Sequence, residues 1–362
     1  MSAQLRKAMV LAAGIGKRLR PLTVQTAKPA LPLLGRPLID YILRRLSRAG
    51  VSEIVVNLHH QPDTLTPSLD RAPSGLTIHR SLETDLLGTA GGLSKVACHF
   101  TSEREFLLVN ADTLVDFNLD DLLQSHRDTR ALATLLLRRR PLGSSYSAVH
   151  VGAGGRIEKI SAGAGASGSA EGDWMFAGVW ILSPEIFRYL SGSPAGLDKE
   201  LLPRLIQDRA VFGCQQDATW ITIDTPRRYL GACLSMARER LHEEDWNVEA
   251  LRDRGEATAW AGEGSRVDSG ATLRGGVVLG QRCRVDGDAV VERVVCWDDV
   301  EIPRGVRLEN CVVTQGVKLR RGMELTDCVV MKAGSDRSGL RKREIRDELV
   351  VAKLGSGRTR GL

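Results

Sequence analysis

Short valine-rich segments recur along the last third of this chain at almost constant spacing. Four of them begin at Arg274, Glu292, Glu309 and Thr326, so successive intervals are 18, 17 and 17 residues. Inside this region an aliphatic residue returns about every sixth position. A period of six within a period of eighteen is typical of a parallel β-helix, in which each sixth side chain points into a three-sided core. The last third is therefore predicted to be a coil of short stacked strands.

The sixfold pattern also predicts which side chains fill the core of that coil. They are Val267, Leu273, Leu279, Val285, Val291, Val294, Val300, Val306, Val312, Val317, Met323 and Val329. Cys311 and Cys328 fall one coil apart, so we expect core residues there and not a metal pair. The pattern resembles the left-handed type of β-helix.

The predicted organisation has four parts. Residues 1–245 form the first domain, 246–262 a linker, 263–331 the β-helix, and 332–362 a basic tail with a short helix around 340–351. An exposed coil edge in the β-helix would favour a partner, so we expect a homo-oligomer formed through this domain.

The first two thirds of the chain alternate strand-like and helix-like segments. A helix with apolar residues at helical spacing is expected from Pro37 to Ala49, where Pro begins it and Gly50 ends it. The expected strands are Ala8–Ala13, Glu53–Leu58, Leu76–His79, Glu105–Asn110 and Ala131–Leu137. This alternation predicts a Rossmann-like α/β domain with a mostly parallel sheet. Ligands of such sheets bind beyond the carboxyl ends of the strands.

Composition limits the classes of partner. No run of 18 apolar residues is present, so no membrane span is expected. Seven cysteines without a Cys-x-x-Cys pair favour reduced thiols and a cytoplasmic location. A net charge of +6 suits an anionic substrate, while an aromatic content of 4% argues against a nucleic-acid partner.

A glycine turn with adjacent cations follows the first predicted strand. Glycine lets the backbone approach a ligand and direct N–H groups toward it, and guanidinium groups grip phosphate oxygens. The third glycine of the dinucleotide fingerprint is missing, and no Gly-Lys-Ser/Thr follows. The turn therefore predicts a polyphosphate site of another kind, built from Leu11, Ala12, Ala13, Gly14 and Gly16 with Arg18, Arg20 and Lys28.

The stretches Val10–Thr23 and Lys28–Ile39 resemble the opening motif of the sugar-1-phosphate nucleotidyltransferases, and the resemblance covers roughly residues 5–240. It implies attack by a sugar 1-phosphate on the α-phosphate of a nucleoside triphosphate, with release of pyrophosphate and Mg²⁺ as cofactor. By this resemblance Arg18 contacts the β- and γ-phosphates, and Lys28 neutralises charge at the α-phosphate. Gly14 and Gly16 supply backbone donors.

Two aspartates are candidates for the metal. Asp112 ends a buried strand and resembles the family's metal carboxylate, although it could instead cap the next helix. Many relatives have their second acid at the position of Thr222, and this chain has Asp224 two residues later. We expect Asp224 to be the second Mg²⁺ ligand, and the alternative is that it caps a helix beginning near Pro226.

Three further segments resemble substrate contacts of the family. Gly88 and Thr89 match the segment beside base and ribose, or form a plain glycine-rich turn. Glu158 and Lys159 match the pair that holds sugar hydroxyls and phosphate, or form an ordinary exposed ion pair. Gly178 matches the sugar-contact glycine, but departures nearby leave the sugar open; these are Ser147 after Tyr146, and Phe176 in place of Asn.

Several functional classes fit this pattern. The matched motifs and the β-helix resemble mannose-1-phosphate guanylyltransferases, which use GTP. Alternatives are a uridylyltransferase for an amino-sugar 1-phosphate such as N-acetylmuramate 1-phosphate, and an inactive regulatory paralogue. An acyltransferase function of the β-helix is disfavoured, because the last histidine, His242, precedes that domain.

Overall fold

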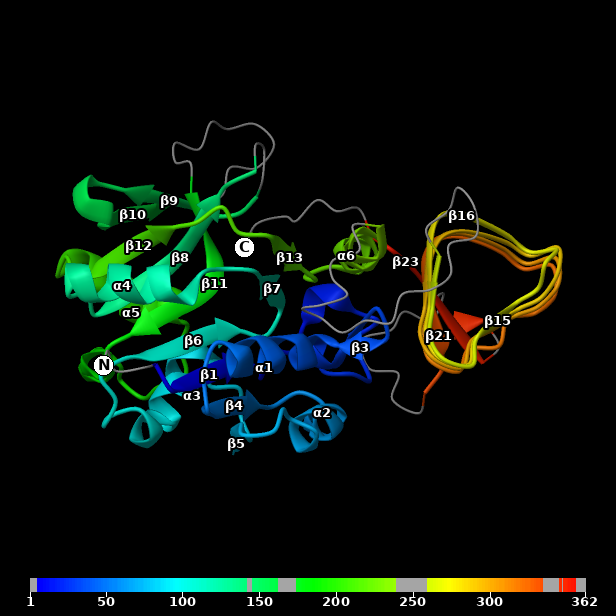
Figure 1. Ribbon diagram of the computed structural model, residues 1–362. Helices are drawn as coiled ribbons and strands as arrows, with labels where there is room; N and C mark the ends of the chain where they lie inside the picture. Colours follow the sequence, from blue (N-terminus) through cyan, green and yellow to red (C-terminus); the bar gives the residue numbers. More distant parts are fainter. Residues whose placement is uncertain are drawn as a thin grey trace. The chain divides into compact units, whose positions relative to one another are not determined.

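The computed structural model describes residues 5–141, 145–161, 174–238, 259–334, 345–346 and 348–355. The chain divides into two compact units (Figure 1). Of the described residues, those within 5–15 and 42–221 belong to unit 1, and those within 16–41 and 222–355 belong to unit 2. The signature segment, residues 16–41, follows the first strand and belongs to the same unit as the β-helix.

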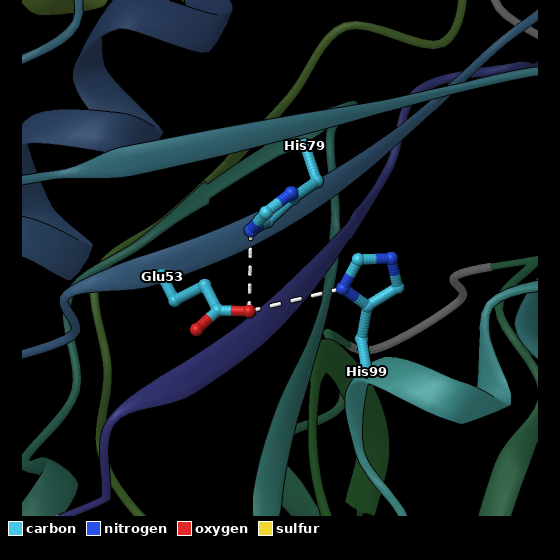
Figure 2. A group of neighbouring side chains, drawn as sticks. All are labelled: Glu53, His79 and His99. Carbon is cyan, nitrogen blue, oxygen red and sulfur yellow. Dashed lines mark ion pairs between the residues drawn. The ribbon is translucent and has the colours of Figure 1, made fainter.

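Four parallel strands form one half of the main sheet in unit 1. They are β1 (Lys7–Leu11), β4 (Glu53–Leu58), β5 (Thr77–Leu82) and β6 (Phe106–Asn110), in the order β6-β1-β4-β5. The alternating pattern predicted all four. Glu53 opens β4, and His79 and His99 lie beside it at the amino-terminal edge of this half (Figure 2).

The other half of the sheet is largely antiparallel. Strand β11 (Trp174–Leu182) runs antiparallel to β6 and to β8 (Ala133–Arg139), and β12 (Val211–Gln215) pairs with β8 in parallel. Strands β9 (Ala148–Val151) and β10 (Ile157–Ser161) pair antiparallel. A parallel return needs a crossover connection, usually a helix. Among the described residues between β8 and β11 there is no α-helix, and β11 returns antiparallel to β8, so the sheet is mixed.

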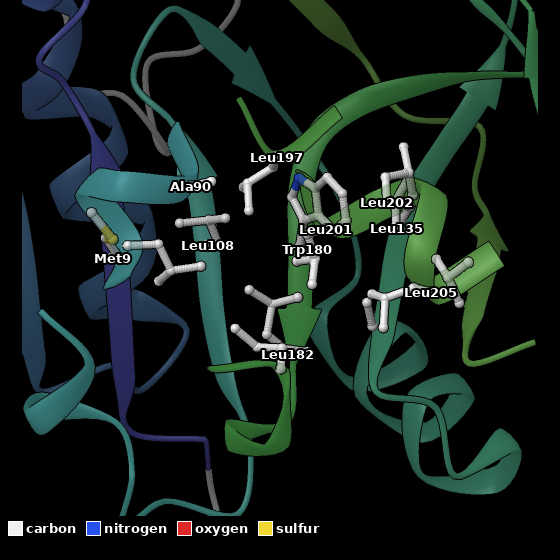
Figure 3. Close-up of a cluster of buried hydrophobic side chains, with 14 of the residues drawn as sticks. Met9, Ala90, Leu108, Leu135, Trp180, Leu182, Leu197, Leu201, Leu202 and Leu205 are labelled. Carbon is white, nitrogen blue, oxygen red and sulfur yellow. The ribbon is translucent and has the colours of Figure 1, made fainter. Parts of the chain in front are cut away.

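The helices supply much of the apolar core of unit 1. In Figure 3, Ala90 of α3 lies beside Leu108 and Leu201 of α5 lies beside Trp180, and Leu205 of α5 belongs to the same cluster. The helices are α1 (Leu38–Arg48), α2 (Thr66–Asp70), α3 (Gly88–Lys95), α4 (Leu119–Thr129) and α5 (Leu197–Gln207). Short elements complete the unit, and they include β7 (Thr113–Val115), β13 (Trp220–Thr222), η3 (Pro62–Thr64), η4 (Ala97–His99), η5 (Ala153–Gly155) and η6 (Pro184–Tyr189).

Unit 2 contains the predicted β-helix, whose coils stack on one another in Figure 1. One face is built from β14 (Ala259–Ala261), β16 (Thr272–Leu279), β18 (Val290–Cys296), β20 (Arg307–Val313) and β21 (Glu324–Lys332), all paired in parallel. A second face has β15 (Arg266–Val267), β17 (Arg284–Val285) and β19 (Glu301–Ile302). Of the predicted linker, residues 259–262 are described, and strand β14 already begins there.

The interior of the β-helix confirms most of the predicted sixfold positions, including Val294, Val300 and Val306. Val312 and Val329 are buried but do not belong to the interior cluster, so their assignment was wrong by one residue. These coils have 17 residues, and the interior positions are Cys311 and Cys328, which pair across the sheet. Their sulfur atoms lie 3.5 Å apart as free thiols, which confirms that both cysteines are core residues.

The start of the basic tail is a strand where a helix was expected. Strand β23 (Leu349–Lys353) runs antiparallel to β21, and β22 (Ile345–Arg346) pairs with β23. The side chains of Val350, Ala352 and Leu354 are buried. This period of two fits a strand, and the last coil offers an unpaired edge that such a strand can cover. The rest of the tail lies largely outside the described residues.

Helix α6 (Pro226–Arg238) packs on the face of the β-helix formed by β16, β18 and β20. On those strands Val278, Val295 and Val312 are buried outside the interior cluster. The signature segment of the same unit forms η1 (Lys17–Leu19), η2 (Lys28–Ala30), β2 (Pro32–Leu33) and β3 (Arg36–Pro37). Among the described residues, no helix has both the length and the apolar character to cross a membrane.

Candidate active site

The glycine turn of the signature segment requires glycine at position 16. Gly16 has φ of +65°, and a Cβ there would meet Thr23 Cγ2 at 3.0 Å and Lys28 Cβ at 3.4 Å. The Thr23 hydroxyl donates to the Gly16 carbonyl oxygen at 2.8 Å. The turn therefore brings Gly16, Thr23 and the Cβ of Lys28 together.

Arg18 reaches a buried carboxylate within unit 2. Its guanidinium NH1 lies 3.3 Å from Asp224 Oδ2, and its side chain is 64% exposed. Lys28 is half-buried, while Arg20 is exposed. Arg18 and Lys28 both border the glycine turn, because Arg18 follows Gly16 by two positions and the Gly16 Cβ position lies 3.4 Å from Lys28 Cβ. With this exposure the Arg18 side chain is accessible to a ligand, and phosphate binding by it stays a prediction.

Asp224 has one satisfied carboxylate oxygen and one that lacks a donor. Oδ2 accepts from Arg228 NH1 at 2.7 Å, and the residue is 5% exposed. Oδ1 is buried and has no hydrogen-bond partner among the described residues. Buried polar atoms are almost always paired, and a carboxylate oxygen is a ligand that Mg²⁺ accepts. The residue therefore fits a cation site.

Helix α6 is capped by another residue. The Arg228 N–H donates to Thr225 Oγ1 at 3.3 Å, which is the bond expected of a helix cap. Thr225 thus fills the role that the alternative interpretation gave to Asp224. The carboxylate is left facing Arg18 and Arg228.

A buried hydrogen-bond chain joins the signature segment to the β-helix. Trp297 Nε1–H donates to the Tyr229 hydroxyl at 2.8 Å, and that hydroxyl donates to the Pro32 carbonyl oxygen at 2.5 Å. The Tyr41 hydroxyl donates to the neighbouring Leu33 carbonyl at 2.7 Å. Tyr229 is fully buried, and its burial raises the pKa of the phenol well above the usual value. The tyrosine therefore stays neutral and can donate.

In unit 1, a buried polar chain lies behind the carboxyl ends of β1 and β4. The Ala12 N–H donates to Asn57 Oδ1 at 2.8 Å, and Asn57 Nδ2 donates to Glu83 Oε1 at 2.8 Å. Glu83 Oε2 accepts from the Leu87 N–H at 3.0 Å. These hydrogen bonds hold the backbone at Ala12 and at Leu87, which belong to or adjoin the segments predicted to bind the nucleotide.

Sequence reasoning missed both Asn57 and the role of Glu83. Asn57 is 3% exposed and Glu83 is 2% exposed. The signal available was a polar residue within the otherwise apolar end of β4, Glu-Ile-Val-Val-Asn-Leu. Such a residue needs a partner when it is buried, but the sequence does not show which one.

Gly88 and Thr89 contact a loop of their own unit. A Cβ at Gly88, where φ is +71°, would lie 2.3 Å from the Ala195 carbonyl oxygen. Thr89 Oγ1 accepts from the Leu197 N–H at 2.8 Å. Packing therefore explains the glycine, and nucleotide binding by these two residues stays a prediction. Gly14 is exposed, with no atom within 4 Å of its Cβ position, so space for a ligand exists there.

Asp112 and Gly178 come together at the end of β6. The Thr113 hydroxyl donates to Asp112 Oδ1 at 3.0 Å. Gly178, with φ of +98°, would place a Cβ 3.5 Å from Asn110 Cβ and 3.7 Å from Thr113 Cβ. The side chain of Asn118 caps helix α4 by accepting from the Asp120 and Asp121 N–H groups. Asp112 is therefore not the cap of that helix, and its role as a metal ligand stays a prediction.

Glu158 and Lys159 lie on strand β10, with β9 and β11 between it and β6. Both side chains are exposed, and the register shifts between Ile157 and Lys159. Glu158 folds back onto Gly152, where a Cβ would meet its Oε1 at 1.9 Å. Their sugar-binding role stays a prediction.

Comparison with known proteins matches two family models to successive parts of the chain. A model of the family described as nucleotidyl transferase matches residues 7–239. The chain belongs to the nucleotidyl transferase family. A second model, described as GlmU-like C-terminal hexapeptide, matches residues 251–332, which includes the described β-helix.

Relatives of this nucleotidyl transferase carry several substrate names. A probable mannose-1-phosphate guanylyltransferase 1 of Oryza sativa subsp. japonica is 27% identical, covering 85% of this chain and 81% of the relative. The mannose-1-phosphate guanylyltransferase of Mycobacterium tuberculosis is 28% identical over 83% and 82%. A UTP–glucose-1-phosphate uridylyltransferase of Synechocystis is also 28% identical, over 85% and 87%. The class of reaction is thus common to them, and the base and sugar differ.

A solved structure supports the fold. The crystal structure of HddC from Yersinia pseudotuberculosis superposes with a TM-score of 0.55 at 20% identity, covering 63% of this chain and 98% of HddC. At this sequence identity, the likeness concerns the fold alone.

Proposed function

We propose that this protein is a Mg²⁺-dependent sugar-1-phosphate nucleotidyltransferase that joins mannose 1-phosphate and GTP into GDP-mannose and pyrophosphate. The observation that carries the proposal is the glycine turn on which Arg18 meets Asp224 and beside which Lys28 is held. Guanylyltransferases among the relatives that span both predicted domains favour this substrate pair.

Positioning and charge neutralisation dominate in nucleotidyl transfer, because the protein has little covalent chemistry to perform. Arg18 neutralises the β- and γ-phosphates, and Lys28 stabilises charge that builds at the α-phosphate. Asp112 and Asp224 supply carboxylate oxygens to Mg²⁺, which lowers the charge of the triphosphate when bound. Glu158, Lys159 and Gly178 hold the sugar phosphate, and the backbone from Leu11 to Gly16 faces the nucleotide.

A second candidate is a uridylyltransferase, because a relative of similar identity is named for UTP and glucose 1-phosphate. An amino-sugar 1-phosphate is a further candidate sugar. Both share the residues named above and differ only in which base and sugar fit.

A substrate panel tests the proposal. Purified protein is incubated with Mg²⁺, each of the four common nucleoside triphosphates plus dTTP, and mannose, glucose and N-acetylated amino-sugar 1-phosphates, and pyrophosphate release is measured. We expect the highest kcat/KM for GTP with mannose 1-phosphate. A preference for UTP would contradict the guanylyltransferase proposal and support the uridylyltransferase candidate. Absence of pyrophosphate release with every pair would contradict an active transferase.

Variants of the turn test the mechanism. We expect Arg18→Ala to lower kcat/KM by at least about 100-fold, because transition-state charge loses its partner. Asp112→Ala and Asp224→Ala should lower it comparably and weaken the dependence on Mg²⁺. Lys17→Ala, at the exposed neighbour of Arg18, is the matched control and should stay near the wild-type value. Equal activity of Arg18→Ala and Lys17→Ala would refute the assignment.

We also propose that the protein forms a homo-oligomer through the β-helix and works in a reducing, cytoplasmic compartment. The hexapeptide-repeat match supports the first statement. The second is supported by the seven cysteines, all of which are free thiols. Light scattering of the purified chain measures the oligomer.

A further inference from the structure

Two histidines and a glutamate from three separate elements meet at the amino-terminal edge of the parallel half-sheet (Figure 2). Glu53 is the first residue of β4, His79 lies on β5, and His99 ends η4. His79 Nε2 is 3.2 Å and His99 Nδ1 is 3.8 Å from the same oxygen, Glu53 Oε1. The imidazole ring centroids are 4.7 Å apart.

These three atoms have the spacing of a metal site that needs only slight closure. All lie within 4.8 Å of one another. With metal–ligand bonds of about 2.0–2.1 Å, neighbouring ligands of a tetrahedral zinc ion are about 3.3 Å apart. Side-chain exposures of 27% for Glu53, 39% for His79 and 30% for His99 leave the cluster open to an ion.

We propose that Glu53, His79 and His99 bind a divalent transition-metal ion, with Zn²⁺ as the best match. Two imidazole nitrogens and one carboxylate oxygen suit zinc, and three protein ligands leave one position for water. Mg²⁺ prefers oxygen ligands throughout, so this donor set selects a different ion from the one proposed for the transfer reaction.

The location assigns the ion a structural role. Gly14 and Asp112 follow the carboxyl ends of the parallel strands β1 and β6, whereas Glu53 begins β4. The six residues of β4 span about 17 Å. An ion at this edge ties β4, β5 and η4 together, at a distance from the reacting phosphates.

Lys7 is the competitor for this site. Its ammonium lies 3.6 Å from Glu53 Oε1, but it also lies 3.1 Å from Glu103 Oε1 and donates to the His99 carbonyl at 2.9 Å. When Glu53 binds the ion, Lys7 keeps these other two partners. Removing its charge should therefore tighten metal binding, an effect that no other role of this cluster predicts.

The test is calorimetric titration of tag-free, metal-stripped protein with Zn²⁺, in the absence of substrates. We expect one equivalent to bind and the melting temperature to rise. His79→Ala and His99→Ala should each weaken binding by at least about tenfold, and Lys7→Met should strengthen it. His150→Ala removes a histidine on β9 outside the cluster and is the matched control, expected to bind as wild type. Cys98→Ser, next to His99 and exposed, should also bind as wild type.

Titration with Co²⁺ gives a second reading that does not depend on stability. Tetrahedral nitrogen and oxygen ligation produces intense visible absorption, which should appear in wild type and disappear in both histidine variants. The proposal is overturned if Zn²⁺ binds equally to wild type and His79→Ala, or if Cys98→Ser alone abolishes binding. Neither outcome affects the transferase proposal, which is tested separately by pyrophosphate release.

Discussion

At the scale of single residues, Gly92 on α3 is a position where a buried polar pair requires glycine. A Cβ there would lie 2.7 Å from Glu83 Oε1 and 3.0 Å from Asn57 Nδ2. Glycine is needed because two buried polar side chains occupy the volume that a methyl group would take. The Asn57–Glu83 pair in turn holds the Ala12 and Leu87 backbone.

We expect Gly92→Ala to lower the free energy of unfolding by about 1–3 kcal/mol, because overpacking would force the pair apart. The turnover rate should fall with it, since the Ala12 backbone loses its anchor. Gly231→Ala in α6 is the control, since nothing lies within 4 Å of its Cβ position. There alanine should be neutral or stabilise by up to about 1 kcal/mol. Urea denaturation of both variants measures the difference, and equal effects would argue against a tight site at Gly92.

At the scale of elements, two buried hydrogen-bonding residues attach helices to their surroundings. His126 on α4 lies 2.9 Å from Thr134 Oγ1 on β8 and 3.1 Å from Ser183 Oγ after β11. Tyr229 on α6 joins Trp297 of the β-helix to Pro32 of the signature segment. Each residue fixes the position of one helix through partners distant in the sequence.

His126 makes the stability of unit 1 depend on pH. Burial, then the charges of Arg127 and Arg104, lower the pKa of His126 from 6.5 to about 4. The unfolded chain therefore binds a proton at higher pH than the folded chain, and stability falls as pH drops from about 6.5 to about 4. Between pH 7.5 and pH 5 the loss from this group is about 2 kcal/mol. Urea denaturation at both pH values measures this loss of unfolding free energy, and in His126→Gln the loss should be smaller by that amount. If His126→Gln and the wild type lose the same unfolding free energy between these pH values, the prediction is wrong.

Tyr229→Phe removes the hydroxyl that serves both Trp297 and Pro32. The N–H of the half-buried Trp297 then loses its acceptor, so we expect a loss of about 1–3 kcal/mol in unfolding free energy. The transferase rate should fall as well, because Pro32 belongs to the segment that carries Lys28. Trp297→Phe keeps the bond from Tyr229 to Pro32 and serves as the comparison. A larger fall in kcat for Trp297→Phe than for Tyr229→Phe would disprove this positioning role.

At the scale of the whole molecule, the chain covers its own exposed strand edge. Strand β23 pairs along β21, from Cys328–Lys353 to Lys332–Leu349. An uncovered β-helix edge offers unpaired N–H and C=O groups to other molecules. Strand β23 thus covers the edge of the β-helix at β21.

Removing residues 345–362 should expose this edge. We expect a lower melting temperature and concentration-dependent association, measured by light scattering. Removing only residues 356–362 keeps β23 and should leave both quantities near those of the full chain. If the two truncations behave alike, β23 does not protect the edge.

Local patterns in the sequence determined the parallel strands, helix α1, the coil of short strands and the signature turn with Arg18 and Lys28. These follow from periodicity and from the conformational freedom of glycine, which act over a few residues. The interior positions of the 17-residue coils were not predicted, because the coil can be one residue shorter at a corner without losing the strand pattern. Strand β23 was not predicted either, because its pairing depends on which strand edge the fold leaves open nearby.

Only the tertiary structure decided which distant polar groups meet. It paired Asp224 with Arg18, Asn57 with Glu83, and Tyr229 with Pro32 and Trp297, and it gathered Glu53, His79 and His99. Each contact joins residues at least 20 positions apart in the sequence. Hydrogen bonds and ion pairs act over about 3–4 Å, and only the folded backbone brings such groups within that range.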